Sequence, residues 1–372
     1  MNKLFYLSQS RLPSRAANSV HVMKMAQAFA RTGLNVSLSA RAGEGAMPSE
    51  MLCRHYGVEP VFDLHVIDPG GLPRPAVRYT ISALRRARRA GASMIYTRHP
   101  GSGFLAEVFG WRAVVELHMP DAGRAMRAYL RVARRPLVVV ITEALRRKVI
   151  ADLGVDPNAV IVAPDGADPM PPEVRPALPP AAPGRLRVGF LGHLYRGKGM
   201  EVISAIAPRC PWADFEIVGG TDEDIARWRA KLDELPNLRF HGYVPHAQTP
   251  AYLKSFDVAL LPNQRFVGGV GGSRNISQWT SPLKAFEYMA AGLPIIASDQ
   301  PNLREVLEHE VNALLCPPDD VAAWCQALER LRENQGLRAG LGRTASQLFA
   351  ERYSWQARAR RLKDAVFDCG SQ

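Results

Sequence analysis

Short apolar runs alternate with helix-forming segments along the whole chain, and this alternation constrains the fold more than any other feature. Residues 4–7 form the first apolar run, and a polar loop then leads into a segment with apolar side chains at helical spacing. Gly33 marks the end of that helix, and the next apolar run begins at residue 36. Strands that alternate with helices form parallel sheets covered by helices on both faces. The sequence therefore predicts an α/β protein.

A proline-rich stretch interrupts this alternation once, with seven prolines between residues 168 and 184. Proline fixes φ and lacks a backbone donor, so the stretch is expected to be an extended linker. The strand–loop–helix pattern restarts directly after it, and 372 residues suit two domains of ordinary size. We predict a first domain over 1–168, a linker over 169–184 and a second domain over 185–353. A C-terminal helix of about 354–372 that packs back on the first domain is compatible with this division.

The composition indicates the cellular compartment and the redox state of the cysteines. Apolar residues make up 47% of it, yet no apolar run approaches the ~20 residues needed to cross a bilayer. The apolar run at residues 4–7 is too short for a signal peptide, which predicts a cytoplasmic protein. The five cysteines are scattered and contain no C-x-x-C pair, so reduced thiols are expected rather than a disulfide framework or a zinc site.

The net charge of +12 attracts polyanions. Two readings of the arginine clusters stay open: solvated helix faces, or attraction to an anionic membrane at ~1 kcal/mol per basic group. The second reading would place the protein at the inner face of the plasma membrane. Nucleic acid is not an expected partner, because no aromatic residues are interleaved with the charge. The clusters are Arg85, Arg86, Arg88 and Arg89, and Arg124, Arg127, Arg131 and Arg134.

A predicted helix begins at Ser281-Pro282, with proline in its first turn, and ends at Gly292. The unpaired N–H groups of a helix N-terminus suit a diphosphate. Glu287 lies less than two turns along this helix, where its carboxylate can accept hydrogen bonds from ribose hydroxyls. Spacing alone equally allows a solvated helix with an incidental glutamate.

Two polar residues, Glu116 and His118, alternate along a predicted strand and so share one face of the sheet. His118 comes at the carboxyl end of the strand, and Arg98 follows another strand. Asp222-Glu223-Asp224 has the D-x-D spelling of some metal sites, but it opens a helix, where carboxylates cap free N–H groups. We therefore predict a capping role. The glycine-rich run at 267–273 is not a dinucleotide fingerprint, because Arg274 stands at its final position.

The segment from residue 280 to 299, together with Pro301 and Arg304-Glu305, is similar to the donor-site signature of glycosyltransferase family 4. The resemblance covers nearly the whole chain. It implies the GT-B fold, in which two Rossmann-like doubly wound domains face each other across a cleft that binds ligands. Similar stretches are 189–192, Lys198-Gly199, 216–219, 240–244, 257–262 and 165–168.

The resemblance implies a metal-independent, hexosyltransferase-like enzyme that retains the anomeric configuration. Its donor would be a nucleotide diphosphate sugar, UDP- or GDP-linked, which is a co-substrate, and no cofactor or metal is expected. Its acceptor would be a hydroxyl on a glycan or lipid-linked saccharide in polysaccharide, lipopolysaccharide or glycolipid assembly. Trp279 and His193 stand where the family often has Glu and Arg. A catalytically silent nucleotide-sugar-binding subunit, or another GT-B enzyme such as a nucleotide-sugar epimerase, therefore stays an alternative.

The resemblance also suggests a role for individual residues. Catalytic roles fall to His118, Lys198 and Glu287, and acceptor contacts to Ser19, Arg98 and His118. The expected donor contacts are Gly192, His193, Arg196, Lys198, Tyr243, Val244, Ser281, Pro282, Leu283, Lys284 and Glu287.

Overall fold

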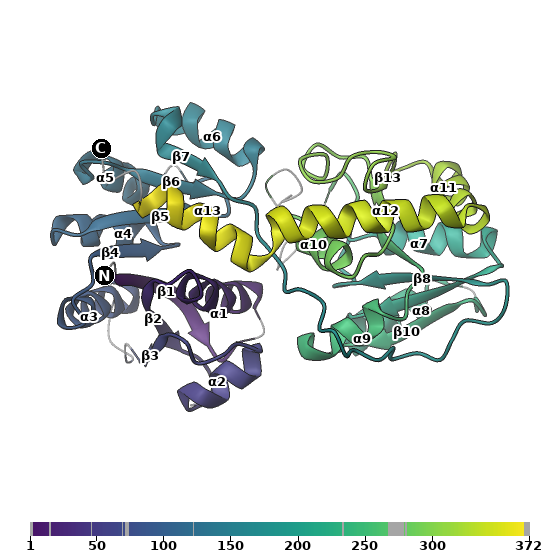
Figure 1. Ribbon diagram of the computed structural model, residues 1–372, viewed down its shortest axis with the longest axis horizontal. Helices are drawn as coiled ribbons and strands as arrows, with labels where there is room; N and C mark the ends of the chain where they lie inside the picture. The colour runs from purple at the N-terminus through teal and green to yellow at the C-terminus, as the bar shows by residue number, and fades with distance from the viewer. Residues whose placement is uncertain are drawn as a thin grey trace. The chain divides into compact units, whose positions relative to one another are not determined.

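The chain forms two compact units in the computed structural model (Figure 1). Unit 1 contains Met1–Pro164 and Trp355–Gln372, and unit 2 contains Asp165–Ser354. Each unit has one sheet, and every strand pairing in both sheets is parallel. The predicted α/β class with two Rossmann-like sheets is confirmed. The described residues are 3–14, 16–45, 47–68, 70, 74–121, 123–232, 234–266, 279 and 281–367.

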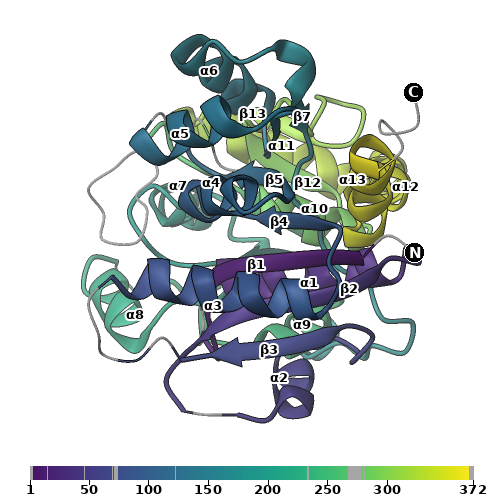
Figure 2. The same ribbon diagram turned by 90° about the vertical axis from the view of Figure 1, so that its left-hand side faces the viewer.

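Unit 1 has a seven-stranded sheet in the order β3-β2-β1-β4-β5-β6-β7, and Figure 2 shows strands β3, β1, β4 and β5 one above another. Helix α1 contacts α2 and the C-terminal helix α13, while α4 contacts α3 and α5, so two sets of helices cover the sheet. The strands are β1 (Lys3–Leu12), β2 (Asn35–Ala42), β3 (Asp63–Ile67), β4 (Met94–Thr97), β5 (Arg112–Leu117), β6 (Leu137–Val140) and β7 (Val160–Val162). The helices are α1 (Ala17–Ala30), α2 (Ser49–Tyr56), α3 (Pro75–Arg89), α4 (Pro100–Val108), α5 (Arg124–Val132), α6 (Glu143–Leu153) and α13 (Trp355–Phe367).

Unit 2 has a six-stranded sheet in the order β10-β9-β8-β11-β12-β13. Apolar clusters pack around Phe215 and Trp324 and around Phe286 and Ile295, so both faces of the sheet are buried, as parallel sheets require. The strands are β8 (Leu186–Leu191), β9 (Ala213–Val218), β10 (Leu238–Gly242), β11 (Val258–Leu261), β12 (Ile295–Ser298) and β13 (Leu314–Cys316). The helices are α7 (Met200–Ile206), α8 (Asp222–Arg229), α9 (Thr249–Leu253), α10 (Leu283–Ala290), α11 (Val321–Glu333) and α12 (Gln335–Leu348).

The proline-rich stretch at 169–184 contains no helix or strand and lies against the α9 region. The backbone N–H of Ala177 donates to the carbonyl of Ala251 at 2.9 Å, and that of Leu178 donates to Ser255 Oγ at 3.1 Å. Helix α13, by contrast, is bonded to unit 1, since Lys363 Nζ donates to the carbonyl of Thr32 at 2.9 Å. The chain thus returns to its first unit at Trp355.

Candidate active site

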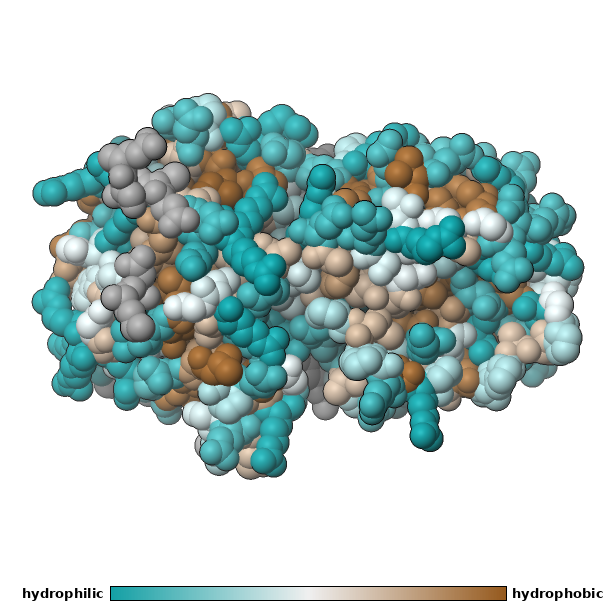
Figure 3. Space-filling model, viewed as in Figure 1, coloured by the Kyte–Doolittle hydropathy of each residue, from teal (hydrophilic) through white to brown (hydrophobic). Residues whose placement is uncertain are grey.

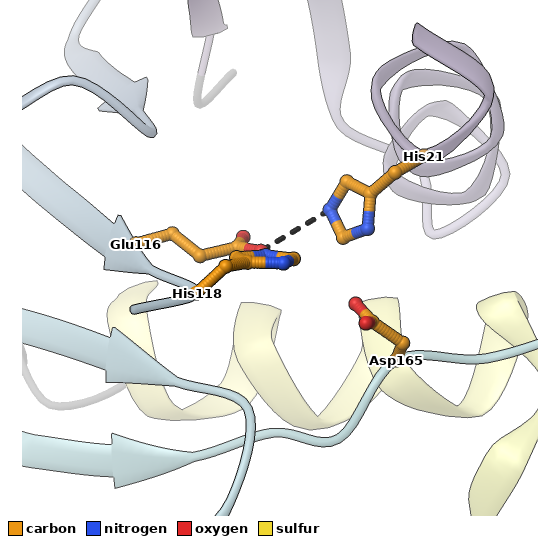
Figure 4. Close-up of side chains that lie close together, drawn as sticks. All are labelled: His21, Glu116, His118 and Asp165. Atoms are coloured by element: carbon orange, nitrogen blue, oxygen red, sulfur yellow. Dashed lines mark hydrogen bonds and ion pairs between the residues drawn. The ribbon is translucent and has the colours of Figure 1, made fainter. Parts of the chain in front are cut away.

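A buried carboxylate on β5, Glu116, is the centre of a polar cluster in unit 1 (Figure 4). Its Oε1 lies 3.1 Å from His21 Nε2 on α1 and accepts a short hydrogen bond from His118 Nε2. The His21 and His118 rings meet edge to face, with centroids 5.0 Å apart. The predicted common face of Glu116 and His118 is therefore confirmed. When neutral, His118 carries its hydrogen on Nε2, because that nitrogen donates to the carboxylate.

The charge of Glu116 is balanced by Arg358, which α13 contributes. Arg358 Nη2 lies 3.1 Å from Glu116 Oε1, and its Nε donates to the carbonyl of Pro164 at 2.9 Å. Tyr96 donates to Glu116 Oε2. Burial raises the pKa of Glu116, but Arg358, His21 and the histidine hydrogen bonds outweigh it and hold that pKa well below its usual value. The carboxylate is therefore ionised at neutral pH.

Three of these side chains could also be considered as metal ligands. His21, Glu116 and His118 each offer a ligand atom, and these atoms lie within 4.8 Å of one another. The guanidinium of Arg358, however, already holds the same carboxylate oxygen and would repel a second cation. The arrangement is better suited to orienting His118.

All three predicted acceptor residues follow the carboxyl ends of adjacent strands of unit 1. Ser19 lies in the first turn of α1, after β1, and its Oγ donates to the carbonyl of Arg11 at 3.0 Å. Arg98 directly follows β4, and His118 directly follows β5. These strands neighbour one another in the order β1-β4-β5, and parallel sheets bind ligands at this edge.

The loop between β8 and α7 carries the first group of predicted donor residues in unit 2. The N–H of Gly192 donates to the carbonyl of Val218 at 2.9 Å, which places this loop against the one after β9. Gly219 has φ +120, and a Cβ there would lie 2.1 Å from the Gly192 carbonyl oxygen. Only glycine fits this approach. The two backbones therefore form one floor at the carboxyl ends of β8 and β9.

Basic residues of the β8–α7 loop lie near a basic residue of α10, whose charge lowers their pKa. Burial lowers the pKa of Lys198, and the charge of Lys284 on α10 lowers it further. Burial also lowers the pKa of His193, followed by the charges of Lys284 and then Lys198. The ring of His193 stacks on Tyr195 at 4.9 Å. Positive charge that lowers the pKa of neighbouring basic groups indicates a place that suits an anionic ligand.

Helix α10 brings Lys284 and Glu287 together, with 2.9 Å between Lys284 Nζ and Glu287 Oε2. The predicted helix start at Ser281-Pro282 is wrong: α10 begins at Leu283, because Pro282 has ψ 73 and is the N-cap. Ser281 is buried, and its Oγ accepts from the backbone N–H of Asp165 at 3.1 Å. Its side chain thus holds the start of the helix.

The other predicted donor residues of unit 2 differ in their surroundings. The guanidinium of Arg196 lies 5.8 Å from the ring centroid of Phe266, Tyr243 is 60% exposed, and Val244 packs on the core around Phe286. The glycine-rich run at 267–273 lies outside the described residues.

Two features of unit 2 bear on sequence predictions away from the floor. Thr221 Oγ1 accepts from the N–H of Asp224, whose carboxylate accepts from the N–H of Thr221. The predicted capping role is therefore confirmed for Asp224, and Asp222 and Glu223 lie with it in the first turn of α8. A cavity of about 720 Å³ lies beside β8, β9 and β10, and no predicted site residue lines it. Its walls include Arg185, Asp214, Glu216, Arg239 and His241, which form ion pairs among themselves.

Sequence reasoning missed three residues of these sites. His21 and Arg358 hold Glu116, and Tyr288 on α10 accepts from the N–H of Leu191 at 3.0 Å through its buried hydroxyl. A polar residue on the buried side of α1 was the available signal for His21. Neither Arg358 nor Tyr288 has a local signal, because each acts on an element far away in the sequence.

Comparison with known proteins finds matches to glycosyltransferase family models in both parts of the chain. The family model of glycosyl transferases group 1 matches residues 185–334, and that of Glycosyltransferase Family 4 matches residues 19–170. Phosphatidyl-myo-inositol mannosyltransferase of Mycolicibacterium smegmatis is 33% identical over 46% of this chain and 43% of that protein. D-inositol 3-phosphate glycosyltransferase of Xylanimonas cellulosilytica is 25% identical over 93% of this chain and 90% of that protein.

The fold comparison covers nearly the full length. Anabaena HepE, solved in complex with UDP-glucose, has a TM-score of 0.69 at 16% identity, covering 99% of this chain and all of that one. The chain spans about half the length of the first curated relatives it matches. Two parallel Rossmann-like sheets with this likeness define the GT-B class of fold. The chain belongs to glycosyltransferase family 4.

Proposed function

We propose that the protein transfers a sugar from a nucleotide diphosphate sugar to a hydroxyl acceptor, with retention of configuration and without a metal. Unit 2 would bind the donor and unit 1 the acceptor. The observation that carries the proposal is the convergence of Lys198, Lys284 and His193 beside Glu287 in the segment matched by the glycosyltransferase model. The UDP and UDP-glucose complexes of HepE support a nucleotide-sugar donor.

The chemistry assigns a task to each group. Breaking a glycosyl–phosphate bond builds negative charge on the leaving diphosphate, which Lys198 and Lys284 would stabilise in a partly dry site. Glu287 would turn from Lys284 toward ribose hydroxyls. The acceptor hydroxyl would attack from the leaving-group side and give its proton to the departing phosphate, and His118, held by Glu116, would lie at the reacting sugar.

A screen of nucleotide sugars tests the proposal directly. A ligand that binds only the folded state raises Tm, so UDP-, GDP- and ADP-sugars are compared by thermal shift, and the binding one is then assayed for nucleotide release. Slow release supports a transferase. Binding without release favours the silent subunit, and no binding of any nucleotide sugar rejects the proposal.

Glu287→Ala is expected to weaken binding of the nucleotide sugar about 10- to 100-fold, because hydrogen bonds to a charged group are worth roughly 1.5–3 kcal/mol. Isothermal titration with the nucleotide identified by the screen measures the change. Glu333→Ala, an exposed glutamate of the same unit, is the control. An unchanged Kd would remove Glu287 from the donor site.

We also propose peripheral contact with anionic membranes, which would bring the enzyme to a lipid-linked acceptor of cell-surface glycan assembly. None of the described helices is long and apolar enough to span a bilayer. The surface seen in Figure 3 is mainly hydrophilic, with hydrophobic residues in small separate areas. The arginines at 85, 86, 88 and 89 on α3 and at 124, 127 and 131 on α5 are exposed, as surface attraction requires.

Arg85→Gln with Arg89→Gln is expected to reduce binding to phosphatidylglycerol vesicles about 30-fold, since each basic group contributes ~1 kcal/mol. Sedimentation with vesicles measures the bound fraction. Phosphatidylcholine vesicles are the uncharged control. Equal binding to both lipids, or insensitivity to salt, would contradict an electrostatic contact.

A further inference from the structure

Three neighbouring strands of unit 1 have, at or near their carboxyl ends, residues with a buried polar atom that lacks a hydrogen-bond partner among the described residues. The strands are adjacent in the order β2-β1-β4. The atoms are Arg41 Nε on β2, Gln9 Oε1 on β1 and Arg98 Nη1 directly after β4, and none has a partner among the described residues. Buried polar groups in proteins are nearly always hydrogen-bonded. Three exceptions at one edge of one sheet indicate a ligand that completes them.

The amide of Gln9 has a definite orientation. Its Nε2 donates to the carbonyl of Ala76 at 3.2 Å and to Thr80 Oγ1 at 3.0 Å, both on α3. A carbonyl oxygen only accepts, so the nitrogen must face α3, and Oε1 faces away from that bond. Gln9 therefore offers an acceptor for a hydroxyl of a ligand.

The two arginines offer positive charge at the same edge. Arg41 acts on Tyr79 of α3, where its charge opposes the rise that burial causes in the pKa of that tyrosine. Arg41 thus lies on the α3 side of the sheet, as Gln9 does. Neither Arg41 nor Arg98 forms an ion pair with any carboxylate among the residues the structure describes. A partly buried guanidinium without a counter-ion is costly, and an anion relieves that cost.

We infer that the sugar acceptor carries a phosphate group, which Arg41 and Arg98 bind, next to a hydroxyl that donates to Gln9. The inference rests on the proposed glycosyltransferase function. Guanidinium groups match phosphate and carboxylate alike. Donors that arrive from two different strands fit the several oxygens and the double charge of a phosphate better than the two oxygens of a planar carboxylate.

The test compares acceptor analogues that differ in the group at C6, which is a phosphate, a hydroxyl or a carboxylate. Glucose 6-phosphate, glucose and glucuronic acid are titrated into the wild-type protein and into Arg41→Gln, Arg98→Gln and the control Arg78→Gln, an exposed arginine of α3. Glucose 6-phosphate is expected to bind more tightly than the other two. Each site variant should lose about 10- to 100-fold of that affinity, and the control should lose none. Equal binding of glucuronic acid, or no loss in the site variants, would overturn the inference.

A stability measurement separates ligand binding from a structural role. Arg41→Gln and Arg98→Gln are expected to keep or raise Tm without ligand, because each removes a partly buried charged group with one buried nitrogen that has no hydrogen-bond partner among the described residues. A fall in Tm of several degrees in both variants would mean that the arginines serve the fold, against the inference.

Two further experiments identify the source of the phosphate and test the phosphate site separately from the proposed glycosyltransferase function. Glycerol 1-phosphate is compared with phosphatidic acid in vesicles, and preference for either still supports a phosphate site. Nucleotide release from the donor sugar by wild type tests the proposed function separately, and the control Arg78→Gln is expected to leave that release unchanged. If wild type releases no nucleotide but its phosphate binding depends on Arg41, the proposed function fails and the phosphate site stands.

Discussion

Arg358→Met is expected to lower the free energy of unfolding by about 3–5 kcal/mol, because it leaves the carboxylate of Glu116 buried without its cation. Both side chains are almost fully buried, with relative exposures of 1% and 0%, so water cannot replace the lost partner. The variant also lacks the hydrogen bonds that Arg358 donates to the carbonyls of Ala163 and Pro164. Urea unfolding followed by tryptophan fluorescence measures the change.

Arg361→Met is the matched control, since it makes the same substitution at an exposed position of the same helix. It should alter the unfolding free energy by less than about 0.5 kcal/mol. The double variant Glu116→Gln with Arg358→Met should recover part of the loss, because no charge then stays unpaired. A full loss in the double variant would contradict the ion-pair explanation.

The same pair predicts how stability depends on pH. The folded-state pKa of Glu116 is lowered relative to its ordinary value of 4.5. A lowered pKa means that its stabilisation is fully present above about pH 4.5 and is lost as pH falls through the folded pKa. Wild type should therefore lose stability below pH 4.5 more steeply than Glu116→Gln, which lacks this titrating group.

Lys198→Ala is expected to reduce kcat about 10²- to 10³-fold while weakening ground-state donor binding much less. The expectation applies to transfer or donor hydrolysis with the nucleotide sugar found by the screen. Removing one preorganised group that stabilises developing negative charge costs roughly 2.7–4 kcal/mol in other enzymes. Lys198 meets that description because it lies near the charge of Lys284 at the proposed diphosphate site. Interactions that strengthen only in the transition state raise kcat, so their loss lowers kcat more than it weakens donor binding.

The control for this prediction is Lys254→Ala, an exposed lysine that follows α9 in the same unit. Initial rates over a range of donor concentrations separate kcat from KM. A variant that raises KM alone would make Lys198 a ground-state binding residue instead. Burial and Lys284 lower the pKa of Lys198, so this lysine loses its charge at a lower pH than an ordinary lysine. Wild-type activity should therefore fall as pH rises, and the fall should begin below the ordinary lysine pKa of 10.5.

Much of the donor site was predictable because its residues follow local rules. Lys198 lies in a loop between a strand and a helix, and Glu287 lies six residues after Ser281 near a helix start. The pattern of strands and helices predicts these positions, and the family resemblance suggests their roles. The start of α10 was not predictable to the residue, because a sequence pattern does not give the backbone angles at a helix end, here ψ 73 at Pro282. The buried atoms of Gln9, Arg41 and Arg98 that lack a hydrogen-bond partner among the described residues could not be predicted either, since burial is a property of the packed unit.

The sequence by itself determined the alternation of strands and helices, the proline-rich interruption, the loop that contains Lys198 and the helix that contains Glu287, because each depends on neighbours within one or two turns of chain. The tertiary structure decided what surrounds His118. Arg358 reaches Glu116 across 242 positions of the sequence. No periodicity links two residues so far apart, and only the packing of α13 on unit 1 brings the cation to the carboxylate that orients the histidine.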